Sequence, residues 1–514
     1  MKGSFLNRRE FLKAAGVAAA LGLGGSVRAG AGDRANRKES SRRPNFVFFL
    51  IDDMGWTDLG CYGSRFYETP NIDHLAADGM RFTNAYAACP VCSPTRGSIM
   101  TGKYPARLGI TQWIGGPQEP TAYREYMPLE EVTIAEALQE VGYATGFVGK
   151  WHLSTRDETK QRYYPDRQGF DVNIGGDQSG APPTYFYPYE RRNRKLETMP
   201  PGGQEGEYLT DRLTDESLKF LDANHDRPFL LYLSHYAVHT PLESKKDLTE
   251  KYEAKAKDLP SREGPHTKPV YGPYKTRLVQ DHAVYAGMVQ SVDESVGRVM
   301  GKIRELGLER DTIVIFMSDN GGLSTVGREG PTCNLPLRAG KGWLYEGGIR
   351  EPMLIKWPRV VRAGGVCHEP VTSTDFYPTM LEMVGLPARP RQHVDGLSLV
   401  PLLKGTGTPR REAIYWHYPH YHGSGNRPSG AVRAGDYKLI EWYEDGRVEL
   451  YNLKADLGEQ HDLAAAMPEK ARQLRRMLHA WHRQVDAKMP DGEPRKDYQI
   501  WLDSRKKGAT GGTG

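Results

Sequence analysis

The chain has 514 residues, 38% of them hydrophobic and 26% charged, which is ordinary for a soluble globular enzyme of two domains or of one domain with an appendage. Residues 1–43 carry ten Lys or Arg against three Asp or Glu, a net charge of +7, so the whole-chain charge of +5 leaves −2 for residues 44–514. Bulk charge therefore excludes a nucleic-acid or other polyanion binder, and any attraction for anions must be local.

The basic residues at the amino terminus belong to a predicted export signal. Residues 7–13 read NRREFLK, close to the twin-arginine consensus R-R-x-F-L-K, and the apolar stretch 14–23 is too short to span a bilayer as a helix. A short basic amphipathic helix is the alternative interpretation. The first interpretation predicts a twin-arginine signal peptide over 1–31 and a polar linker over 32–44, with no stable membrane span. It also predicts a bacterial protein that the twin-arginine translocase exports to the periplasm or beyond the cell.

From residue 45 to about 390 the sequence alternates between short apolar runs and longer helix-period segments, the pattern of an α/β domain. Because the apolar runs are almost continuous, we expect strands that are buried on both faces, in a sheet covered by helices. Strands are predicted over 45–51, 143–149, 229–234, 312–318 and 353–357, and helices over 71–79, 133–141, 209–223, 277–306 and 376–384.

After residue 390 the pattern changes to short strands joined by Gly and Asp turns. This predicts a smaller C-terminal α+β subdomain over 391–500, an antiparallel sheet with one helix packed against the main domain, and a flexible tail over 501–514. Its strands are expected over 413–418, 429–433, 437–443 and 448–451, and its helix over 468–485.

Polar residues follow four of the predicted strands, at the point where each strand ends. In open α/β sheets, ligands bind at the carboxyl ends of the strands, so polar groups that follow several strands are expected to form one site. These residues are Asp52 and Asp53, Lys150 and His152, His235 and His239, and Asp319 and Asn320.

Each of these groups also has an interpretation without function. The two aspartates could cap a following helix or turn, and Asn320-Gly321 is a strong signal for a tight hairpin turn. Lys150 and His152 could be a solvated strand end, and His239 a loop histidine. Only the joint pattern favours a functional site.

The oxygen donors among these residues predict a metal. Two carboxylates after one strand and an Asp-Asn pair after another form an all-oxygen ligand set, which selects Ca²⁺ or Mg²⁺ over Zn²⁺. Ca²⁺ is favoured because a cage of six or more ligands at flexible angles suits its looser coordination.

The segment CPVCSPTR, residues 89–96, allows two chemistries for its cysteines. Cys89 and Cys92 have the C-x-x-C spacing of a redox centre or of half a zinc site. Cys92, Pro94 and Arg96 also form C-x-P-x-R, in which the cysteine can be rebuilt after translation. The chain has five cysteines, an odd number, which in an exported protein indicates that one of them is not in a disulfide. The other four could form two disulfides.

Seven motifs between residues 44 and 490 occur in the order that one enzyme family has them. They are PNFVFFLIDDMGWTDLGCYG, TPNIDHLAADGMRFTNAYA, CSPTRGSIMTGKYPARLG, GYATGFVGKWHL, HYAVHTP, SDNGG and GKGWLYEGGIREP. With them the chain resembles the formylglycine-dependent sulfatases, the arylsulfatase family of the alkaline phosphatase superfamily. The resemblance implies a sulfuric ester hydrolase (EC 3.1.6) whose catalytic domain, 45–390, holds a large mixed, mostly parallel sheet sandwiched by helices.

The resemblance also assigns roles to individual residues. It implies that a formylglycine-generating enzyme converts Cys92 to 3-oxoalanine (Cα-formylglycine), whose hydrate is the nucleophile. It implies one calcium ion, with residue 92 completing a shell made by Asp52, Asp53, Asp319 and Asn320. The remaining active-site positions fall on Arg96, Lys150, His152, His239 and Lys341.

The chemistry of a sulfate ester explains why such groups are needed. The ester is an anion that repels a nucleophile, so Ca²⁺, Lys150 and Lys341 would offset its charge. Arg96 would hold the diol and restrain Lys150. His239, with Lys341 as a possible partner, would protonate the departing alcohol, and His152 would take a proton from the second diol hydroxyl so that sulfate is eliminated.

The expected substrate is a sulfated carbohydrate, either a polysaccharide or an oligosaccharide. The stretch WHYPHYH over 416–422, with Arg427, combines aromatic faces and polar donors that suit a sugar ring, and it could equally be a packing seam between the two domains. The long segments 155–205 and 241–275 are candidate specificity loops.

Three other functions fit parts of the sequence. A phosphatase or phosphonate monoester hydrolase of the same superfamily would share the fold. A C-x-x-C oxidoreductase would use Cys89 and Cys92 together, but it gives Pro94 and Arg96 no role. A non-catalytic protein would bind sulfated glycans without releasing sulfate.

Overall fold

A computed structural model of the chain describes residues 43–259, 264–271, 274–326 and 330–491. The predicted signal peptide over 1–31, all but the last two residues of the linker over 32–44, and the predicted tail over 501–514 lie outside the described residues. In the part of the chain that is described, no helix combines the length and the apolar character needed to cross a membrane.

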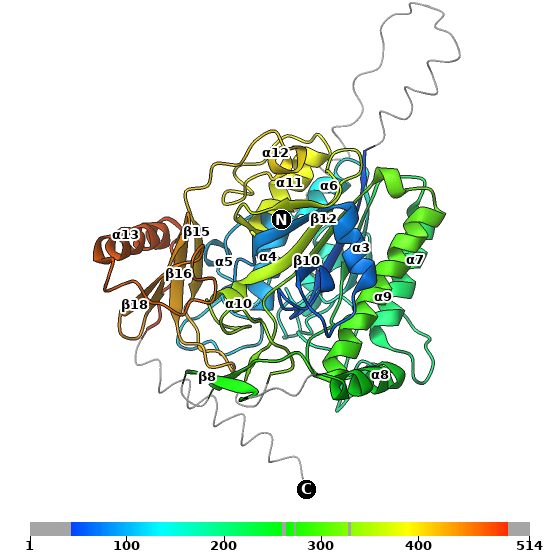
Figure 1. Cartoon of the computed structure of the whole chain (residues 1–514). Helices are drawn as coiled ribbons and strands as arrows, with labels where there is room; N and C mark the ends of the chain where they lie inside the picture. Colours follow the sequence, from blue (N-terminus) through cyan, green and yellow to red (C-terminus); the bar gives the residue numbers. More distant parts are fainter. Residues whose placement is uncertain (1–42, 260–263, 272–273, 327–329, 492–514) are drawn as a thin grey trace, which may run out of the picture. The chain divides into compact units, whose positions relative to one another are not determined.

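A nine-stranded sheet forms the centre of the fold and confirms the predicted α/β class (Figure 1). Its strands are β1 Asn45–Ile51, β2 Met80–Tyr86, β3 Ala144–Gly149, β4 Val172–Ile174, β7 Phe229–Ser234, β10 Thr312–Ser318, β12 Arg350–Lys356, β13 Gly365–Cys367 and β14 Val371–Thr372. Five adjacent strands run parallel in the order β10, β1, β7, β3, β4. Beyond β10, the strand β12 pairs antiparallel with both β10 and β2, while β13 and β14 pair parallel with β2.

Alternation along β1 shows how the sheet is buried on both faces. Phe46, Phe48 and Leu50 belong to one hydrophobic core, and the intervening Val47, Phe49 and Ile51 belong to another. Three helices complete the core that contains Val47, namely α3 Pro70–Asp78, α7 Leu209–Asn224 and α9 Ala283–Glu305. Three others complete the core that contains Phe46, namely α4 Cys92–Thr101, α6 Ile134–Gln139 and α11 Phe376–Met383.

The predicted elements match the structure best where the sequence is continuously apolar. The predicted strands 45–51, 229–234 and 312–318 coincide with β1, β7 and β10. The predicted helix over 277–306 is too long, because α9 begins at Ala283, where the side chain of His282 accepts the backbone N–H of Tyr285 and caps the helix. Strand β2 was not predicted, because its sequence MRFTNAY mixes polar with apolar residues.

Shorter elements surround the sheet. They are α5 Pro105–Leu108, β5 Glu190–Arg191, β6 Arg194–Lys195, α8 Lys246–Lys257, β8 Thr267–Tyr271, β9 Tyr274–Arg277, β11 Thr325–Val326, α10 Glu346–Ile349 and α12 Val400–Lys404, with 3-10 turns at Gly60–Tyr62, Lys160–Tyr163, Pro165–Arg167, Glu309–Asp311 and Ser373–Asp375. Strands β5 and β6 form a hairpin, and β11, β9 and β8 form a three-stranded sheet.

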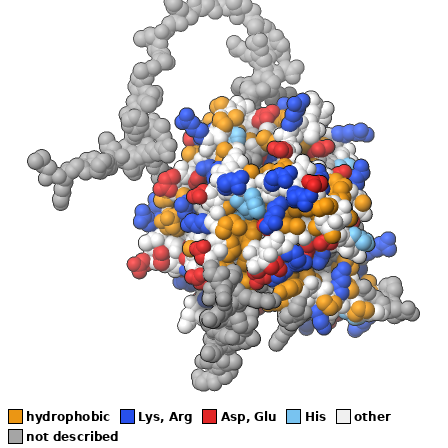
Figure 2. All heavy atoms as spheres, turned by 90° about the vertical axis from the view of Figure 1, so that its left-hand side faces the viewer, with side chains coloured by type: hydrophobic (Ala, Val, Ile, Leu, Met, Phe, Trp, Pro, Cys, Tyr) orange, Lys and Arg blue, Asp and Glu red, His pale blue; other side chains and the backbone are white. Residues whose placement is uncertain are grey.

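The C-terminal region forms the predicted antiparallel sheet and helix. The strands β15 Ile414–Tyr418, β16 Ser429–Ala434, β17 Tyr437–Trp442 and β18 Val448–Asn452 pair in chain order, and α13 spans Pro468–Gln484. Val432 and Leu439 pack with Leu474 of α13, while Ala431 and Ile440 pack against the main domain. Figure 2 shows Lys and Arg side chains interspersed with Asp and Glu on the side where this sheet lies, which agrees with a chain that has little bulk charge.

A group of buried charged side chains joins the C-terminal sheet to the main domain. We call Glu346, Arg350, Lys438 and Glu459 the seam cluster. Lys438 Nζ lies 2.9 Å from Glu346 Oε1 and 2.8 Å from Glu459 Oε1, and Arg350 Nη1 lies 3.2 Å from Glu346 Oε2. These pairs hold Glu346 at the start of α10.

Candidate active site

The carboxyl ends of β10, β1, β7 and β3 meet at one edge of the sheet. Strands β1 and β10 are in register up to Ile51 and Ser318, so Asp52-Asp53 and Asp319-Asn320 leave the sheet side by side. At the end of β3, the backbone N–H of Lys150 donates to the carbonyl oxygen of Ser234 at 2.7 Å. The preceding Gly149 has φ 104°, and a Cβ there would lie 1.9 Å from that oxygen, so the close approach of the two strands requires glycine.

Cys92 and Arg96 reach the same place from helix α4. Cys92 begins the helix and Arg96 lies one turn later, so their side chains share one helix face. Cys92 Sγ lies 3.3 Å from His152 Nδ1. Arg96 is buried and donates through Nη1 to the carbonyl oxygen of Lys150 at 2.6 Å and to Ser234 Oγ at 2.7 Å.

Three ion pairs form the centre of the site. Lys150 Nζ lies 2.5 Å from Asp52 Oδ2, Lys341 Nζ lies 2.5 Å from Asp53 Oδ1, and Arg96 Nη2 lies 2.7 Å from Asp319 Oδ2. All six side chains are buried, and we call them the site cluster. The structure thus brings together the carboxylates and cations that the sequence placed in different segments.

Three buried side-chain oxygen atoms at this centre accept no hydrogen bond from the described residues. Asp52 Oδ1, Asp53 Oδ2 and Asn320 Oδ1 are buried and have no hydrogen-bond partner among the described residues. Asn320 donates its amide Nδ2 to Asp53 Oδ1 at 2.8 Å, which leaves its oxygen for another ligand. Buried polar atoms without partners are rare in proteins, and carboxylate and amide oxygens are the donors that Ca²⁺ or Mg²⁺ prefers. This donor set fits a hard divalent cation.

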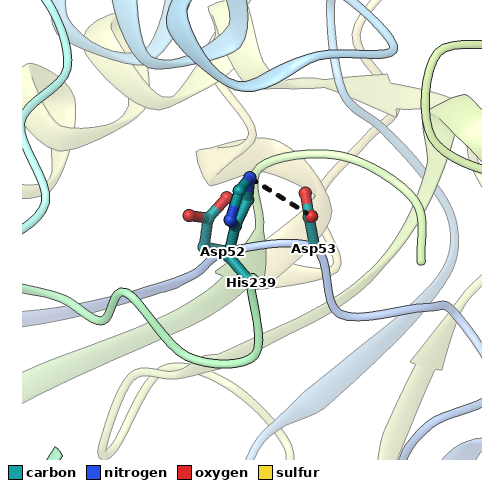
Figure 3. A group of neighbouring side chains, drawn as sticks. All are labelled: Asp52, Asp53 and His239. Atoms are coloured by element: carbon teal, nitrogen blue, oxygen red, sulfur yellow. Dashed lines mark ion pairs between the residues drawn. The ribbon is translucent and has the colours of Figure 1, made fainter. Parts of the chain in front are cut away.

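His239 also lies at this position, although the sequence did not place it among the metal ligands. Ligand atoms of Asp52, Asp53 and His239 lie within 4.8 Å of one another, and Figure 3 shows the imidazole beside both carboxylates. His239 Nε2 is 3.7 Å from Asp53 Oδ2.

Asn320-Gly321 does not form the hairpin turn that its sequence allowed. Asn320 bonds to Asp53 as described, and a Cβ at Gly321 would lie 1.9 Å from the carbonyl oxygen of Gly347. Glycine at position 321 therefore allows the backbone to pass close to helix α10.

Burial and charge shift the acidities in opposite directions at the two neighbouring aspartates. Burial, with the carboxylates of Asp319 and Asp53 nearby, raises the pKa of Asp52 to about 8 despite Lys150. Burial also opposes ionisation of Asp53, but the ammonium of Lys341 and the imidazole of His239 hold its pKa below the usual range. A cation bound at the open oxygens would favour the charged form of Asp52.

The histidine contacts define which ring nitrogen carries hydrogen. His152 Nε2 lies 2.9 Å from the carbonyl oxygen of Ile114, which can only accept, so Nε2 donates and the lone pair of Nδ1 faces Cys92. His239 Nδ1 lies 2.7 Å from the carbonyl oxygen of Thr240, so Nδ1 donates and Nε2 faces Asp53. Burial lowers the pKa of His152 well below its usual value and, with Lys341, lowers the pKa of His239 to about 3.

Two site residues have a strained backbone. Asp53 has φ 63° and His152 has φ 55°, in the left-handed region that non-glycine residues rarely adopt. In each case the turn follows directly after a strand of the central sheet, and it redirects the side chain toward Cys92 or the cation position. Such conformations persist only where the surrounding structure enforces them.

A cavity of about 750 Å³ opens above this group. Five of the predicted site residues line it, namely Asp53, Cys92, His152, His239 and Lys341. Residues that sequence reasoning did not single out form its walls, namely Trp113, Arg156, Gln178, Ser179, Gly180, Ala181, Arg194, Thr240, Leu323, Gly423 and Ser424. Several of these lie in the candidate specificity segment 155–205, which was the signal available in the sequence.

His235 follows β7 as expected but takes another role. It is fully buried, and its Nε2 lies 2.9 Å from Ser295 Oγ of helix α9, outside the described lining of the cavity. It is a packed core histidine.

The aromatic stretch 416–422 is mainly a packing seam. Trp416 is fully buried and donates Nε1–H to the carbonyl oxygen of Ala87, and Tyr418 donates to Gln112 Oε1. Arg427 pairs with Glu444 at 2.8 Å. Of the described residues in this stretch, Tyr421 and His422 line the cavity. The packing-seam interpretation therefore holds for most of the stretch, and a sugar contact stays a prediction for Tyr421 and His422.

The cysteines do not support a redox pair. All five cysteines lie within the described part of the chain and none forms a disulfide there, so the pairing considered for four of them is not formed. Burial raises the pKa of the Cys89 thiol well above its usual value, which disfavours the thiolate that a redox pair needs.

Comparisons with known proteins agree with the motifs. The family described as Sulfatase matches residues 44–386, and the family described as N-sulphoglucosamine sulphohydrolase, C-terminal, matches residues 339–487. The chain is 33% identical over 503 residues to arylsulfatase A of Homo sapiens, covering 88% of this chain and 90% of that protein. It is 31% identical over 523 residues to a sulfatase of Formosa agariphila, with 87% and 90% covered. The solved structure of Ps i-CgsB in complex with k-i-k-neocarrahexaose is 30% identical, with a TM-score of 0.70, and 90% of this chain and 98% of that one are covered.

Proposed function

Because the chain belongs to the sulfatase family and is a sulfuric ester hydrolase, we propose that it removes sulfate from carbohydrates. The observation that carries this proposal is the cavity, whose floor holds Cys92 beside an ammonium group and two histidines, and whose walls hold aromatic and cationic side chains. Support comes from the oligosaccharide bound by Ps i-CgsB, a structure 30% identical to this chain.

We propose that one calcium ion binds at the open oxygens of Asp52, Asp53 and Asn320, with Asp319 and residue 92 completing its shell. When bound, calcium would supply a fixed positive charge that stabilises negative charge on the transferring group. Asp319 Oδ2 is committed to Arg96, and Asp319 Oδ1 accepts the backbone N–H of Asp53 at 3.3 Å. Arg96 therefore positions one of the proposed calcium ligands.

We propose that Cys92 is converted to Cα-formylglycine by a formylglycine-generating enzyme. The support is the C-x-P-x-R sequence and the place of the side chain on the cavity floor. The modified residue would supply a hydrated aldehyde as nucleophile. His152 suits the removal of a proton from a hydroxyl on residue 92, because its Nδ1 lone pair faces that side chain at 3.3 Å and burial keeps the ring neutral.

Cationic side chains would hold the ester for attack. Lys341 lines the cavity and Lys150 lies buried behind Asp52, so both ammonium groups would offset the charge of the sulfate. His239 presents Nε2 to the cavity while Thr240 holds Nδ1. A bound anion would raise the pKa of His239, so the imidazolium could protonate the departing alcohol oxygen through Nε2.

We propose that the enzyme is exported through the twin-arginine route, on the strength of the sequence NRREFLK. Fusion of residues 1–43 to a reporter that works only after export tests this. The reporter should reach the periplasm, and Arg8→Lys combined with Arg9→Lys should block it. Export that survives this double substitution would reject the proposal.

Mass spectrometry and sulfate release together test the function. The active enzyme should yield a peptide ending at Arg96 whose residue 92 has the mass of formylglycine, and it should release sulfate from a panel of sulfated sugars faster than phosphate from matched phosphate esters. Cys92→Ala should abolish sulfate release, with Cys89→Ser as the matched control that retains it. Unconverted Cys92 in a fully active enzyme, or faster phosphate release, would overturn the proposal.

A further inference from the structure

Two arginine side chains in the cavity wall have no part in the proposed chemistry. Arg156 follows His152 by four residues, and Arg194 lies on β6 of the β5–β6 hairpin. Both side chains are exposed and both line the cavity. They therefore present guanidinium groups to whatever extends from the floor of the cavity toward solvent.

The backbone holds each arginine at the wall. A Cβ on Gly115 would lie 2.2 Å from Arg156 Cζ, so the guanidinium rests against the backbone of a glycine that has φ 85°. Arg194 Nη2 donates to the carbonyl oxygen of Ala181 at 3.4 Å, on the segment 178–181 that also lines the cavity. A larger residue at position 115 would displace Arg156 from this place.

Cationic side chains outnumber carboxylates in the described lining of the cavity. Among the described residues that line the cavity, Asp53 is the sole carboxylate, and it already pairs with Lys341. Arg156 and Arg194 thus add positive charge to a described lining that holds no second carboxylate. A surface of this kind is complementary to an anion.

The cavity is also larger than a sulfate group needs. Its volume of about 750 Å³ falls within the range of about 300–1,000 Å³ typical of pockets that enclose a drug-sized ligand. Trp113 lies half-buried in the same wall and offers an aromatic face of the kind that packs against a sugar ring. The space can therefore hold at least one sugar unit beyond the transferred group.

We propose that Arg156 and Arg194 form a subsite for a second anionic group of the substrate, either a sulfate ester or a carboxylate. The substrate class is then a saccharide with two or more anionic groups, of which the one at the floor is cleaved and the one at the wall is recognised. Arginine suits this role because its planar fork can donate two parallel hydrogen bonds to either anion. The inference rests on the proposed function, since the cleaved ester must occupy the floor.

Steady-state kinetics with matched saccharides test the subsite. The substrates are a disaccharide with the cleavable sulfate alone, the same disaccharide with a second sulfate, the same with a uronate carboxylate, and 4-nitrophenyl sulfate. Arg156→Gln and Arg194→Gln should each lower kcat/KM about tenfold for a doubly anionic substrate, through KM, and leave 4-nitrophenyl sulfate unchanged. Arg162→Gln and Arg192→Gln are matched controls, exposed arginines outside the described cavity lining.

Binding to the Cys92→Ala variant separates failure of the subsite from failure of the proposed function, because it needs no turnover. Calorimetry should show the doubly anionic disaccharide binding about tenfold more tightly than the singly anionic one, and both arginine substitutions should remove the difference. The doubly anionic disaccharide, sulfated or uronate-bearing, whose affinity falls more on arginine substitution identifies the second anion. Equal affinity for singly and doubly anionic disaccharides would overturn the subsite, whereas absence of sulfate release from every ester would overturn the proposed function alone.

Discussion

The site cluster and the seam cluster are both buried groups of acidic and basic side chains, but they differ in how their oxygens are used. In the seam cluster, Glu346 accepts from Lys438, Arg350 and Tyr86, and Glu459 accepts from Lys438 and the backbone N–H of Glu346. In the site cluster, Asp52 and Asp53 each keep one oxygen without a hydrogen-bond partner in the described structure.

This difference separates a buried charge group that holds the fold from one that is prepared for a ligand. Taking charges out of water is unfavourable unless every lone pair and proton finds a partner. The seam cluster meets that condition with protein atoms alone. The site cluster does not meet it with the described protein atoms alone, and the calcium ion proposed above would supply the missing partner.

The largest effect is expected from Asp52→Asn, which keeps the shape of the side chain and removes its charge. We expect kcat to fall about 10³-fold, because the proposed calcium site loses a charged ligand. Stability without calcium should also fall, because the substitution leaves the buried ammonium of Lys150 without its counter-ion. Thermal unfolding with and without calcium measures this: calcium should raise the Tm of the wild type, and the variant should lose that rise. A variant that keeps its calcium-dependent rise in Tm would contradict the ligand assignment.

Breaking the seam cluster should affect stability instead of chemistry. Lys438→Met leaves Glu346 and Glu459 buried without their shared cation, which we expect to lower the free energy of unfolding by about 3–5 kcal/mol. The kcat of the folded enzyme at low temperature should remain within about twofold of the wild type. Urea unfolding and sulfate release measure the two effects. A loss of kcat with unchanged stability would show that the two clusters are not separable.

The seam cluster should also make stability depend on pH. Burial raises the pKa of Glu459 from its ordinary 4.5 to about 7, so between these values the folded chain holds a proton that the unfolded chain releases. The free energy of unfolding should therefore decrease as pH rises from about 4.5 to about 7, by about 2–3 kcal/mol. Glu459→Gln should flatten this part of the stability profile, whereas Glu130→Gln, at an exposed position, should leave it in place. A flat profile in the wild type would contradict the prediction.

The smallest effect is expected at Glu351 on β12. Its side chain is fully buried, and neither carboxyl oxygen has a hydrogen-bond partner within the described ranges. Burial, with the carboxylates of Asp319 and Asp53 nearby, raises its pKa well above the usual value, which favours its neutral form. Glu351→Gln should therefore change stability by less than about 1 kcal/mol and kcat by less than about twofold. Weaker calcium binding in this variant would place Glu351 in the site cluster.

The central strands could be predicted from the sequence because burial on both faces leaves continuous apolar runs. Strand β2 could not, since residues such as Arg81 and Thr83 are half-buried and break the run. The order of strands in the sheet could not be predicted from the sequence either, because the neighbouring strands β1 and β10 lie more than 260 residues apart in the chain.

The sequence also predicted the residues at the floor of the cavity better than those in its wall. The floor residues were found because they follow strands or belong to motifs, and the ends of parallel strands converge on one edge of a sheet. Arg156 and Trp113 lie in irregular segments, and their positions depend on tertiary contacts such as the approach of Arg156 to Gly115. The pattern that suggested a sugar platform at 416–422 could not reveal that Trp416 is buried.

The left-handed backbone at Asp53 and His152 has a consequence for how this protein would evolve if its activity were no longer needed. Each such residue costs about 1–3 kcal/mol, and glycine at the same position would avoid most of that strain. Selection for folding alone would therefore favour the substitutions Asp53→Gly and His152→Gly, and selection for turnover would oppose them. In descendants that had lost catalysis, glycine should therefore appear first at these two positions, while the sequence of the supporting sheet stays unchanged.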